Sequence, residues 1–187
     1  MLQYLKEYGK YVEITGFRNI EFSRAEEFLK ANRKEKNQDT CIQFFNAELV
    51  ATTEHLNFAV LNALEAFKNN TNISKSLAME TMLYASAQRQ IQKSIQLLGI
   101  NPKSTDIALV IIGENFGSVK KMLQAVTEFL NAKPDDTALK LTPEKTRKIK
   151  QTYEITSQML KTVTEPNSEQ ALVNLVIERV ALLATQL

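Results

Sequence analysis

The sequence predicts an α+β (mixed α/β) fold in which a small central β-sheet packs with several helices. Its strand-like segments are few, scattered and interleaved with longer segments of helical periodicity. A chain of 187 residues, 44% of them hydrophobic, is long enough to bury its own core. No internal repeat and no Pro/Gly/Ser-rich linker divides it, so we expect residues 1–187 to form a single compact domain.

Three segments, and a weaker fourth, have the pattern of strands. Residues 7–17 alternate in side-chain character, and residues 40–46 form a second apolar run. Residues 106–112 are almost continuously apolar, which predicts a central strand covered on both faces. Residues 138–141 could add a short edge strand.

Helix starts and apolar stripes predict the helices. Each start combines a capping or turn residue with a following apolar period of 3.6 residues. In chain order, the predicted starts lie at Ser23, Thr52-Thr53, Ser76, Asn115, Thr142-Pro143 and Asn167. The helix that begins at Thr142-Pro143 could run through Val163 and end before Pro166. Residues 32–39 are predicted to form a charged loop.

The run Ala85-Ser86-Ala87-Gln88-Arg89-Gln90-Ile91 combines a break in the helical pattern with one arginine between two glutamines. Ser86 is a good N-cap for a further helix that would end at Gly99. The buried stripe of that helix would be Ile91, Ile95 and Leu98. Free backbone N–H groups of residues 87–90, the helix dipole and Arg89 would then meet, which suits a phosphate or carboxylate. Alternatively, Arg89 and the glutamines are solvated residues near an ordinary helix start.

The last predicted helix is apolar on two faces. One face carries Leu172, Leu175, Val176, Arg179 and Leu183, and the other carries Val173, Ile177, Val180 and Ala184. Glu178 and Arg179 interrupt the apolar run. Such a helix is either buried on both sides or uses one face to bind another protein. The second face is therefore a candidate protein-binding surface, with complete burial as the alternative.

Residues that carry metal or nucleophilic chemistry are scarce. Cys41 is the only cysteine, which excludes an intramolecular disulfide, and its apolar neighbours predict a buried thiol. His55 is the only histidine, and we expect it to be a hydrogen-bonded structural residue. No phosphate-binding loop is present. We therefore predict a binding protein without cofactors, metal or catalytic residues.

Two other function classes stay open. An enzyme could hold a small anion at the Ser86 helix start and use His55 as its base. A dimerisation module could instead pair through the last helix. Either reading requires a role for these residues that the sequence pattern alone does not assign.

Charge and hydropathy bound the partners. The formal net charge of +2 is too small to indicate nucleic-acid binding by itself. Basic residues gather in residues 140–150 and 30–36, where they could neutralise phosphates or form solvated helix faces. No apolar run is long enough to span a membrane and the N-terminus lacks a leader pattern, so we expect a cytoplasmic protein without a membrane partner.

Two segments and the last helix resemble a known family. Residues 46–55, followed by Met79-Glu80 and the run at residues 85–91, are similar to the archaeal kinase-binding (Cgi-type) subunit of the KEOPS complex. This subunit is homologous to the eukaryotic PRPK-binding protein. Residues 178–182 also fit the end of the family.

The resemblance implies a non-catalytic regulatory subunit that docks on the N-terminal lobe of the complex's atypical kinase and ATPase. It also implies recruitment of tRNA by its 3′ CCA end, so that the catalytic subunit can install threonylcarbamoyl on an adenosine beside the anticodon. The residues that match the family's polar motif, and are expected to bind tRNA, are Ser86, Gln88, Arg89 and Gln90. The expected kinase contacts are Val173, Ile177, Val180 and Ala184.

This chain departs from the family in two places. The family usually has glycine where this chain has Ala87, and glycine would allow a closer approach of the backbone to a ligand. Residues 151–166 look longer than in compact archaeal members. We expect this stretch to be an insertion that changes the partner surface.

Overall fold

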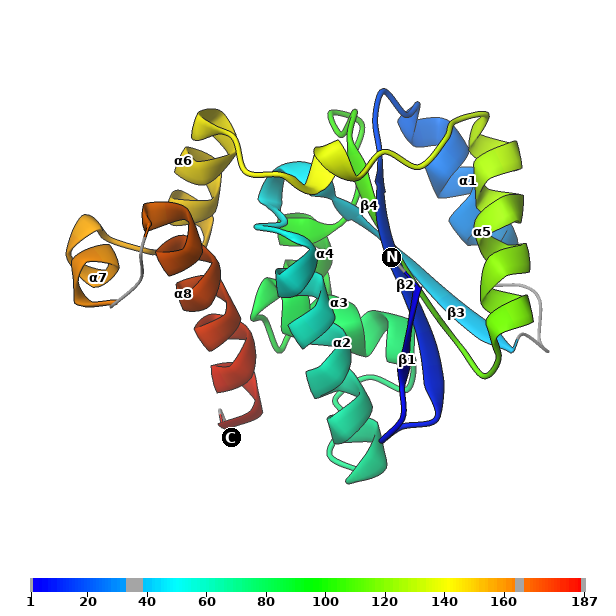
Figure 1. The fold of residues 1–187 in the computed structure, drawn as a ribbon, viewed down its shortest axis with the longest axis horizontal. Coiled ribbons are helices and arrows are strands. Elements are labelled where there is room, and N and C mark those ends of the chain that lie inside the picture. Colours follow the sequence, from blue (N-terminus) through cyan, green and yellow to red (C-terminus); the bar gives the residue numbers. More distant parts are fainter. Residues whose placement is uncertain (1, 33–38, 164–166, 186–187) are drawn as a thin grey trace. The chain divides into compact units, whose positions relative to one another are not determined.

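A computed structural model describes residues 2–32, 39–163 and 167–185 (Figure 1). It confirms the α+β class. The chain separates into two compact units: Met1–Ala47 with Ile100–Ala138, called unit 1 here, and Glu48–Gly99 with Leu139–Leu187, called unit 2. Each unit is described by itself, and the single domain stays a prediction. The predicted loop at residues 32–39 and the end of a helix before Pro166 lie largely outside the described residues.

Unit 1 contains a four-stranded antiparallel sheet. The strands are β1 (Leu2–Leu5), β2 (Lys10–Phe17), β3 (Thr40–Asn46) and β4 (Ile107–Gly113), in the order β1-β2-β4-β3. Every residue of β4 is buried, which confirms the predicted central strand. The sequence prediction missed β1 and started the next strand too early. A hairpin turn separates the two strands, and Gly9 adopts the positive φ of 63° in it.

Helices α1 (Phe22–Asn32) and α5 (Phe116–Leu130) lie on the same side of this sheet (Figure 1). Their apolar stripes pack with Phe17, Phe44 and Leu109 into one core. Asn115 caps α5 by accepting a hydrogen bond from the Ser118 N–H. The predicted cap at Ser23 is wrong, because Ser23 lies inside α1 and its hydroxyl donates to the Glu21 carboxylate.

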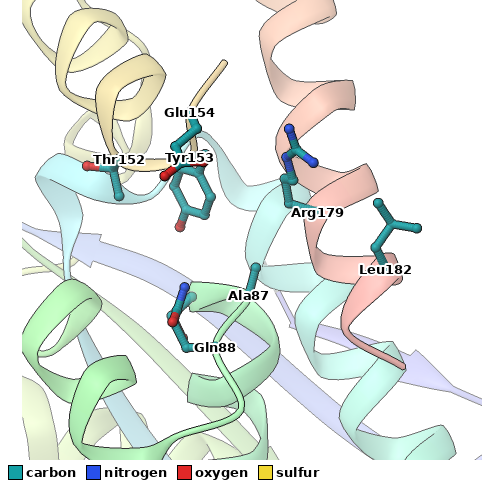
Figure 2. Close-up of a pocket in the computed structure, with 8 residues that line it drawn as sticks. Ala87, Gln88, Thr152, Tyr153, Glu154, Arg179 and Leu182 are labelled. Carbon is teal, nitrogen blue, oxygen red and sulfur yellow. The ribbon is translucent and has the colours of Figure 1, made fainter. Parts of the chain in front are cut away.

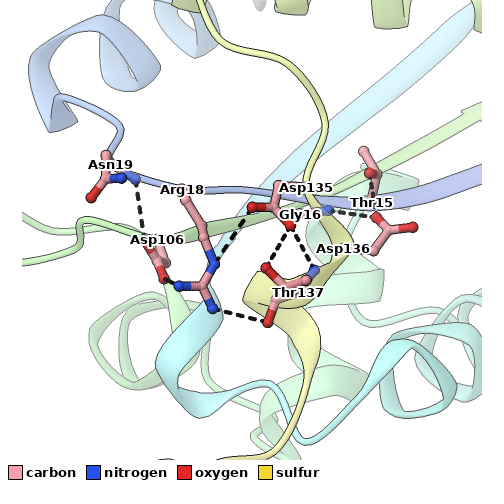
Figure 3. Close-up of polar contacts among 8 residues, drawn as sticks. All are labelled: Thr15, Gly16, Arg18, Asn19, Asp106, Asp135, Asp136 and Thr137. Atoms are coloured by element: carbon pink, nitrogen blue, oxygen red, sulfur yellow. Dashed lines mark hydrogen bonds and ion pairs between the residues drawn. The ribbon is translucent and has the colours of Figure 1, made fainter.

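The predicted edge strand at residues 138–141 is also wrong. Asp136–Leu139 forms a short 3-10 helix instead. The first residue of this 3-10 helix is held against the end of β2 by side-chain hydrogen bonds (Figure 3). The Asp136 carboxylate accepts from the Thr15 hydroxyl at 2.6 Å and from the Gly16 N–H at 3.2 Å. Side-chain hydrogen bonds of this kind stabilise a turn in place of the backbone pairing that an edge strand would need.

Arg18 completes this polar network. Its guanidinium lies 3.9 Å from the Asp106 carboxylate and 3.7 Å from the Asp135 carboxylate, and it donates to the Thr137 carbonyl at 3.1 Å (Figure 3). Asp135 also accepts hydrogen bonds from the backbone and hydroxyl of Thr137. Arg18 pairs with two of the three carboxylates, and neutral donors bond to the third, Asp136. We assign the network a structural role.

Unit 2 is helical in the residues that the structure describes. Its helices are α2 (Thr53–Lys68), α3 (Leu77–Ser86), α4 (Ile91–Leu98), α6 (Pro143–Thr152), α7 (Ser157–Thr162) and α8 (Ser168–Leu182). Helix α2 packs against both α3 and α8. The predicted helix starts at Ser76, Thr142 and Asn167 are confirmed, since each side chain accepts a hydrogen bond from a backbone N–H in the first turn of its helix.

The long helix predicted from residue 143 to residue 163 is two helices. Glu154 has φ 54°, a left-handed conformation that ends α6, and Thr156 caps the short α7 that follows. Tyr153 and Ile155 are buried on either side of this break and pack with Ile149, Leu172 and Val176. The break therefore lets the residues on both sides of Glu154 place their apolar side chains in one core. None of the described helices is long and apolar enough to cross a membrane.

Candidate functional site

The turn between α3 and α4 places the polar motif differently from the prediction. Ser86 is the last residue of α3, not the N-cap of α4. Ala87 adopts the left-handed conformation (φ 51°, ψ 38°) that ends many helices. The Ala87 N–H donates to the Tyr84 carbonyl and the Gln88 N–H to the Leu83 carbonyl. Two of the four donors that were predicted to be free for an anion are therefore already used.

The predicted buried stripe of α4 is correct at Leu98 and wrong at Ile91 and Ile95. Gln90 is the N-cap of this helix, without a side-chain capping bond. Ile91 and Ile95 are 43% and 42% exposed, whereas Ser94 and Leu98 are buried. The Ser94 hydroxyl donates to the Met82 carbonyl at 2.9 Å and lies 2.8 Å from the Ser86 hydroxyl. These hydrogen bonds turn the serine of α4 toward α3, so two isoleucines face outward.

His55 is a structural residue, as predicted. It is fully buried, and its Nδ1 accepts a hydrogen bond from the Ala51 N–H at 3.2 Å. Because Nδ1 is the acceptor, Nε2 carries the proton and donates to the Ala85 carbonyl at 2.8 Å. Burial lowers the pKa of His55 to about 4. With both nitrogens bonded to backbone, His55 has no nitrogen left to act as a general base.

A pocket of about 210 Å³ lies beside this turn (Figure 2). Three segments of unit 2 form it: the end of α3 with the turn, the end of α6, and α8. Its lining residues are Ser86, Ala87, Gln88, Thr152, Tyr153, Glu154, Arg179 and Leu182. Arg179 brings a cationic residue to the pocket wall, which Gln88 and Glu154 also line.

Arg179 was not predicted as a site residue. The sequence signal for it was its position, since Glu178 and Arg179 are the only charged residues in the mostly apolar run 171–184 of the last helix. A charge in such a run needs a polar environment. The pocket provides that environment. The other residues that line it come from segments distant from Arg179 in the sequence, so the sequence pattern could not reveal them.

The four predicted tRNA-binding residues take different positions. Ser86 is buried, and its hydroxyl donates to the Ser94 hydroxyl at 2.8 Å, with the Leu83 carbonyl as an alternative acceptor at 3.1 Å. Gln88 is half-buried and lines the pocket. Arg89 and Gln90 are exposed. Burial and the Glu80 carboxylate raise the pKa of Tyr84, and the positive charge of Arg89 acts in the opposite direction.

The four predicted kinase contacts lie mostly in the core of unit 2. Val173 and Val180 are buried, and Ile177 packs partly buried against the same apolar cluster. Ala184, in the short 3-10 helix Leu183–Thr185, is exposed. The two apolar faces of α8 are therefore largely explained by burial, and Ile177 and Ala184 retain exposed surface.

The basic stretch at residues 140–150 is only partly available to a partner. The Lys145 side chain is buried, and its ammonium donates to the Lys140 carbonyl at 3.4 Å. Lys148 pairs with Glu48 at 2.9 Å and Glu144 at 3.1 Å. Arg147 is exposed and Lys150 half-buried on the helix whose end forms the pocket wall. These two side chains are the basic groups of α6 best placed to meet phosphates.

The described part of the chain offers neither a reactive cysteine nor a metal site. Cys41 is half-buried, and burial raises the pKa of its thiol to about 11. The thiol is therefore protonated near neutral pH, in the form that is a poor nucleophile. Across residues 2–32, 39–163 and 167–185, no group of three His, Cys, Asp or Glu side chains could hold a metal ion.

Comparison with known proteins gives a consistent picture. The family described as "Kinase binding protein CGI-121" matches residues 17–184. Over 113 residues, the chain is 31% identical to the "Regulatory protein Cgi121" of Methanocaldococcus jannaschii, covering 60% of this chain and 70% of that protein. The family match includes the α3–α4 turn and extends over most of the sequence. The chain therefore belongs to the CGI-121 family of kinase-binding proteins.

Proposed function

We propose that this chain is a non-catalytic regulatory subunit that binds a protein kinase and holds the 3′ CCA end of tRNA beside the α3–α4 turn. Membership of the kinase-binding family supports the first part. The observation that carries the second part is the pocket that brings Arg179 to the turn with Gln88. By its resemblance to the KEOPS subunit, the chain would deliver tRNA for threonylcarbamoyl modification of adenosine.

The size and chemistry of the pocket suit the end of a nucleic-acid strand. Pockets for drug-sized ligands have volumes of roughly 300–1,000 Å³. A pocket of about 210 Å³ is smaller and favours one terminal group over a folded RNA surface. A single-stranded end presents phosphates, ribose hydroxyls and base edges. Arg179 suits a phosphate, and the Gln88 amide suits a base edge or a ribose hydroxyl.

The exposed residues beyond the pocket extend this surface. Arg89 and Gln90 follow Gln88 directly, and the first exposed isoleucine of α4 follows them. We assign Arg89 to a phosphate, Gln90 to a base edge, and Ile91 to the apolar face of an unstacked base. Ser86 contributes indirectly, because its buried hydroxyl joins α3 to α4.

Binding of labelled tRNA, intact or trimmed of its CCA end, tests the RNA part. Intact tRNA should bind more tightly, and equal affinities for the two would refute the proposed site. Replacement of Arg89 with glutamate should weaken binding of intact tRNA by about 1–3 kcal/mol if the arginine contacts a phosphate. The matched control is Lys161→Glu, an equal charge change at an exposed position of α7.

Co-purification with the kinase tests the protein part. We propose that Ile177 and Ala184 contact the kinase, while the buried Val173 and Val180 support them from the core. Ala184→Glu should reduce co-purification without loss of the folded state. Ile177→Glu should act in the same direction, and normal kinase binding by both folded variants would place the kinase contact elsewhere.

A further inference from the structure

The carbonyl oxygen of Ala85 accepts hydrogen bonds from two side chains. His55 Nε2 lies 2.8 Å from it, and the Tyr153 hydroxyl lies 3.0 Å from it. Ala85 is the next-to-last residue of α3, and the last four carbonyls of a helix lack partners within the helix. The two side chains therefore satisfy a carbonyl that the end of α3 would otherwise leave unpaired in a buried environment.

The two donors are themselves fixed. Their rings meet edge to face, with centroids 5.6 Å apart, and both side chains are buried. The other ring nitrogen of His55 is held by the Ala51 N–H. The Tyr153 ring packs in the apolar cluster that includes Ile149 and Leu172. Neither ring can move away from the carbonyl without breaking these further contacts. The Tyr153 hydroxyl also lies 3.5 Å from the Leu49 carbonyl, farther than from the Ala85 carbonyl.

Tyr153 also belongs to the pocket wall. It lies in the segment Thr152–Glu154, and all three residues of this segment face the pocket with Gln88 (Figure 2). The left-handed conformation of Glu154 ends α6 at this point. One side chain thus joins the end of α6 to the end of α3, immediately before the left-handed turn at Ala87.

We infer that Tyr153 is a positioning residue, which holds the turn of residues 87–90 in its RNA-binding geometry through the hydrogen bond from its hydroxyl to the Ala85 carbonyl. This inference rests on the proposed function. It gives a role to the first residues of the stretch 151–166, which otherwise stands out in the sequence only by its length. The hydroxyl acts on the RNA through the backbone of the turn, and it is not itself the group that binds RNA.

The variant Tyr153→Phe tests the inference, because it removes only the hydroxyl and keeps the ring in the core. Loss of one hydrogen bond of ordinary strength corresponds to a change of about three- to ten-fold in an equilibrium constant. We expect amide hydrogen exchange at Ala87 and Gln88 to accelerate by about that factor. We also expect affinity for intact tRNA to fall by a similar factor, with unchanged affinity for tRNA that lacks CCA and unchanged kinase co-purification.

The matched control is Tyr4→Phe, which removes the hydroxyl of an exposed tyrosine on β1 and should change neither readout. Unchanged exchange at Ala87 and Gln88 in Tyr153→Phe would overturn the inference, whatever happens to RNA binding. Faster exchange with undiminished affinity for intact tRNA would also overturn it. If the wild-type chain binds intact and trimmed tRNA equally well, the proposed function fails. Faster amide exchange in Tyr153→Phe would still support the part of the inference that concerns the turn, namely that the Tyr153 hydroxyl stabilises it.

Discussion

Helices α4 and α5 have similar apolar periodicity but differ in how far their apolar stripes are buried. In α5, Val119, Val126 and Leu130 enter the core of unit 1. In α4, Ile91 and Ile95 are exposed, and the buried positions are Ser94 and Leu98. The two helices differ in what they pack against. A sheet with an apolar face selects an apolar stripe, whereas the end of α3 presents hydroxyl and carbonyl groups that select a serine.

The contrast shows how helix length affects orientation. The fifteen residues of α5 bury enough apolar surface to determine which face turns inward. The eight residues of α4 bury little apolar surface, and the helix lies between the turn at Ala87 and the turn at Gly99. A Cβ on Gly99 would lie 2.5 Å from the Ile95 carbonyl, so the exit from α4 requires glycine. Apolar side chains that such a short helix leaves outside are then available to a partner.

The largest expected effect comes from a charge placed on equivalent apolar positions of the two helices. Val126→Asp should destabilise the fold by more than about 4 kcal/mol, because it buries an unpaired carboxylate in the core. Ile95→Asp should cost less than about 1 kcal/mol, since the side chain is already largely in solvent. Urea denaturation of both variants measures the difference. Similar losses would mean that the apolar face of α4 is buried after all.

Acid should destabilise the chain through His55, which belongs to the unit of α4. Burial lowers the pKa of His55 to about 4 in the folded state, against an ordinary value of 6.5. The folded state therefore disfavours the protonated form, and its contribution to stability is complete above pH 6.5 and decreases as the pH falls toward 4. Between pH 7 and pH 5 we expect a loss of about 2 kcal/mol.

Urea denaturation at several pH values measures this loss. The variant His55→Gln serves as the control, because it removes the titrating group and should abolish most of the slope between pH 7 and pH 5. Unit 1 has no histidine, since His55 is the only one in the chain. Hydrogen exchange at pH 5 should therefore accelerate in α2 and α3 more than in α5, and uniform acceleration would argue against this assignment.

Removal of one serine hydroxyl from each helix gives an intermediate effect. Ser94→Ala in α4 should cost about 1–2 kcal/mol, because the hydroxyl is buried and pairs with both Ser86 and the Met82 carbonyl. Ser118→Ala in α5 should cost less than about 0.5 kcal/mol, because its hydroxyl bonds only to the Asn115 carbonyl near the surface. Equal costs would remove the argument that buried hydrogen bonds orient α4.

The smallest expected effect concerns the residues after α3 and α5. Ala87 (φ 51°) and Asn131 (φ 51°) both occupy the left-handed region. Because this conformation costs alanine about 1–2 kcal/mol and asparagine less, Ala87→Gly should stabilise the chain by about 0.5–1 kcal/mol. Asn131→Gly should change stability by less than about 0.5 kcal/mol. Thermal denaturation can rank the two, and no gain from Ala87→Gly would show that other contacts relieve the strain.

Local chemistry was sufficient to predict much of the fold. The apolar run of residues 106–112 predicted a central strand, and Thr142-Pro143 and Asn167 predicted helix starts. These features depend on neighbouring residues along the chain, through burial of alternating or continuous apolar side chains and through capping of free N–H groups. The same local information located the polar run at residues 85–91 and the structural role of His55.

Tertiary contacts decided how that run is presented. Whether Ser86 ends one helix or begins the next depends on the backbone conformation of Ala87, and its hydroxyl finds its partner on α4. The pocket needs Tyr153 and Arg179, which come from segments more distant along the chain. Periodicity and capping act over a few residues, whereas the orientation of a short helix and the walls of a pocket depend on contacts between segments that only folding brings together.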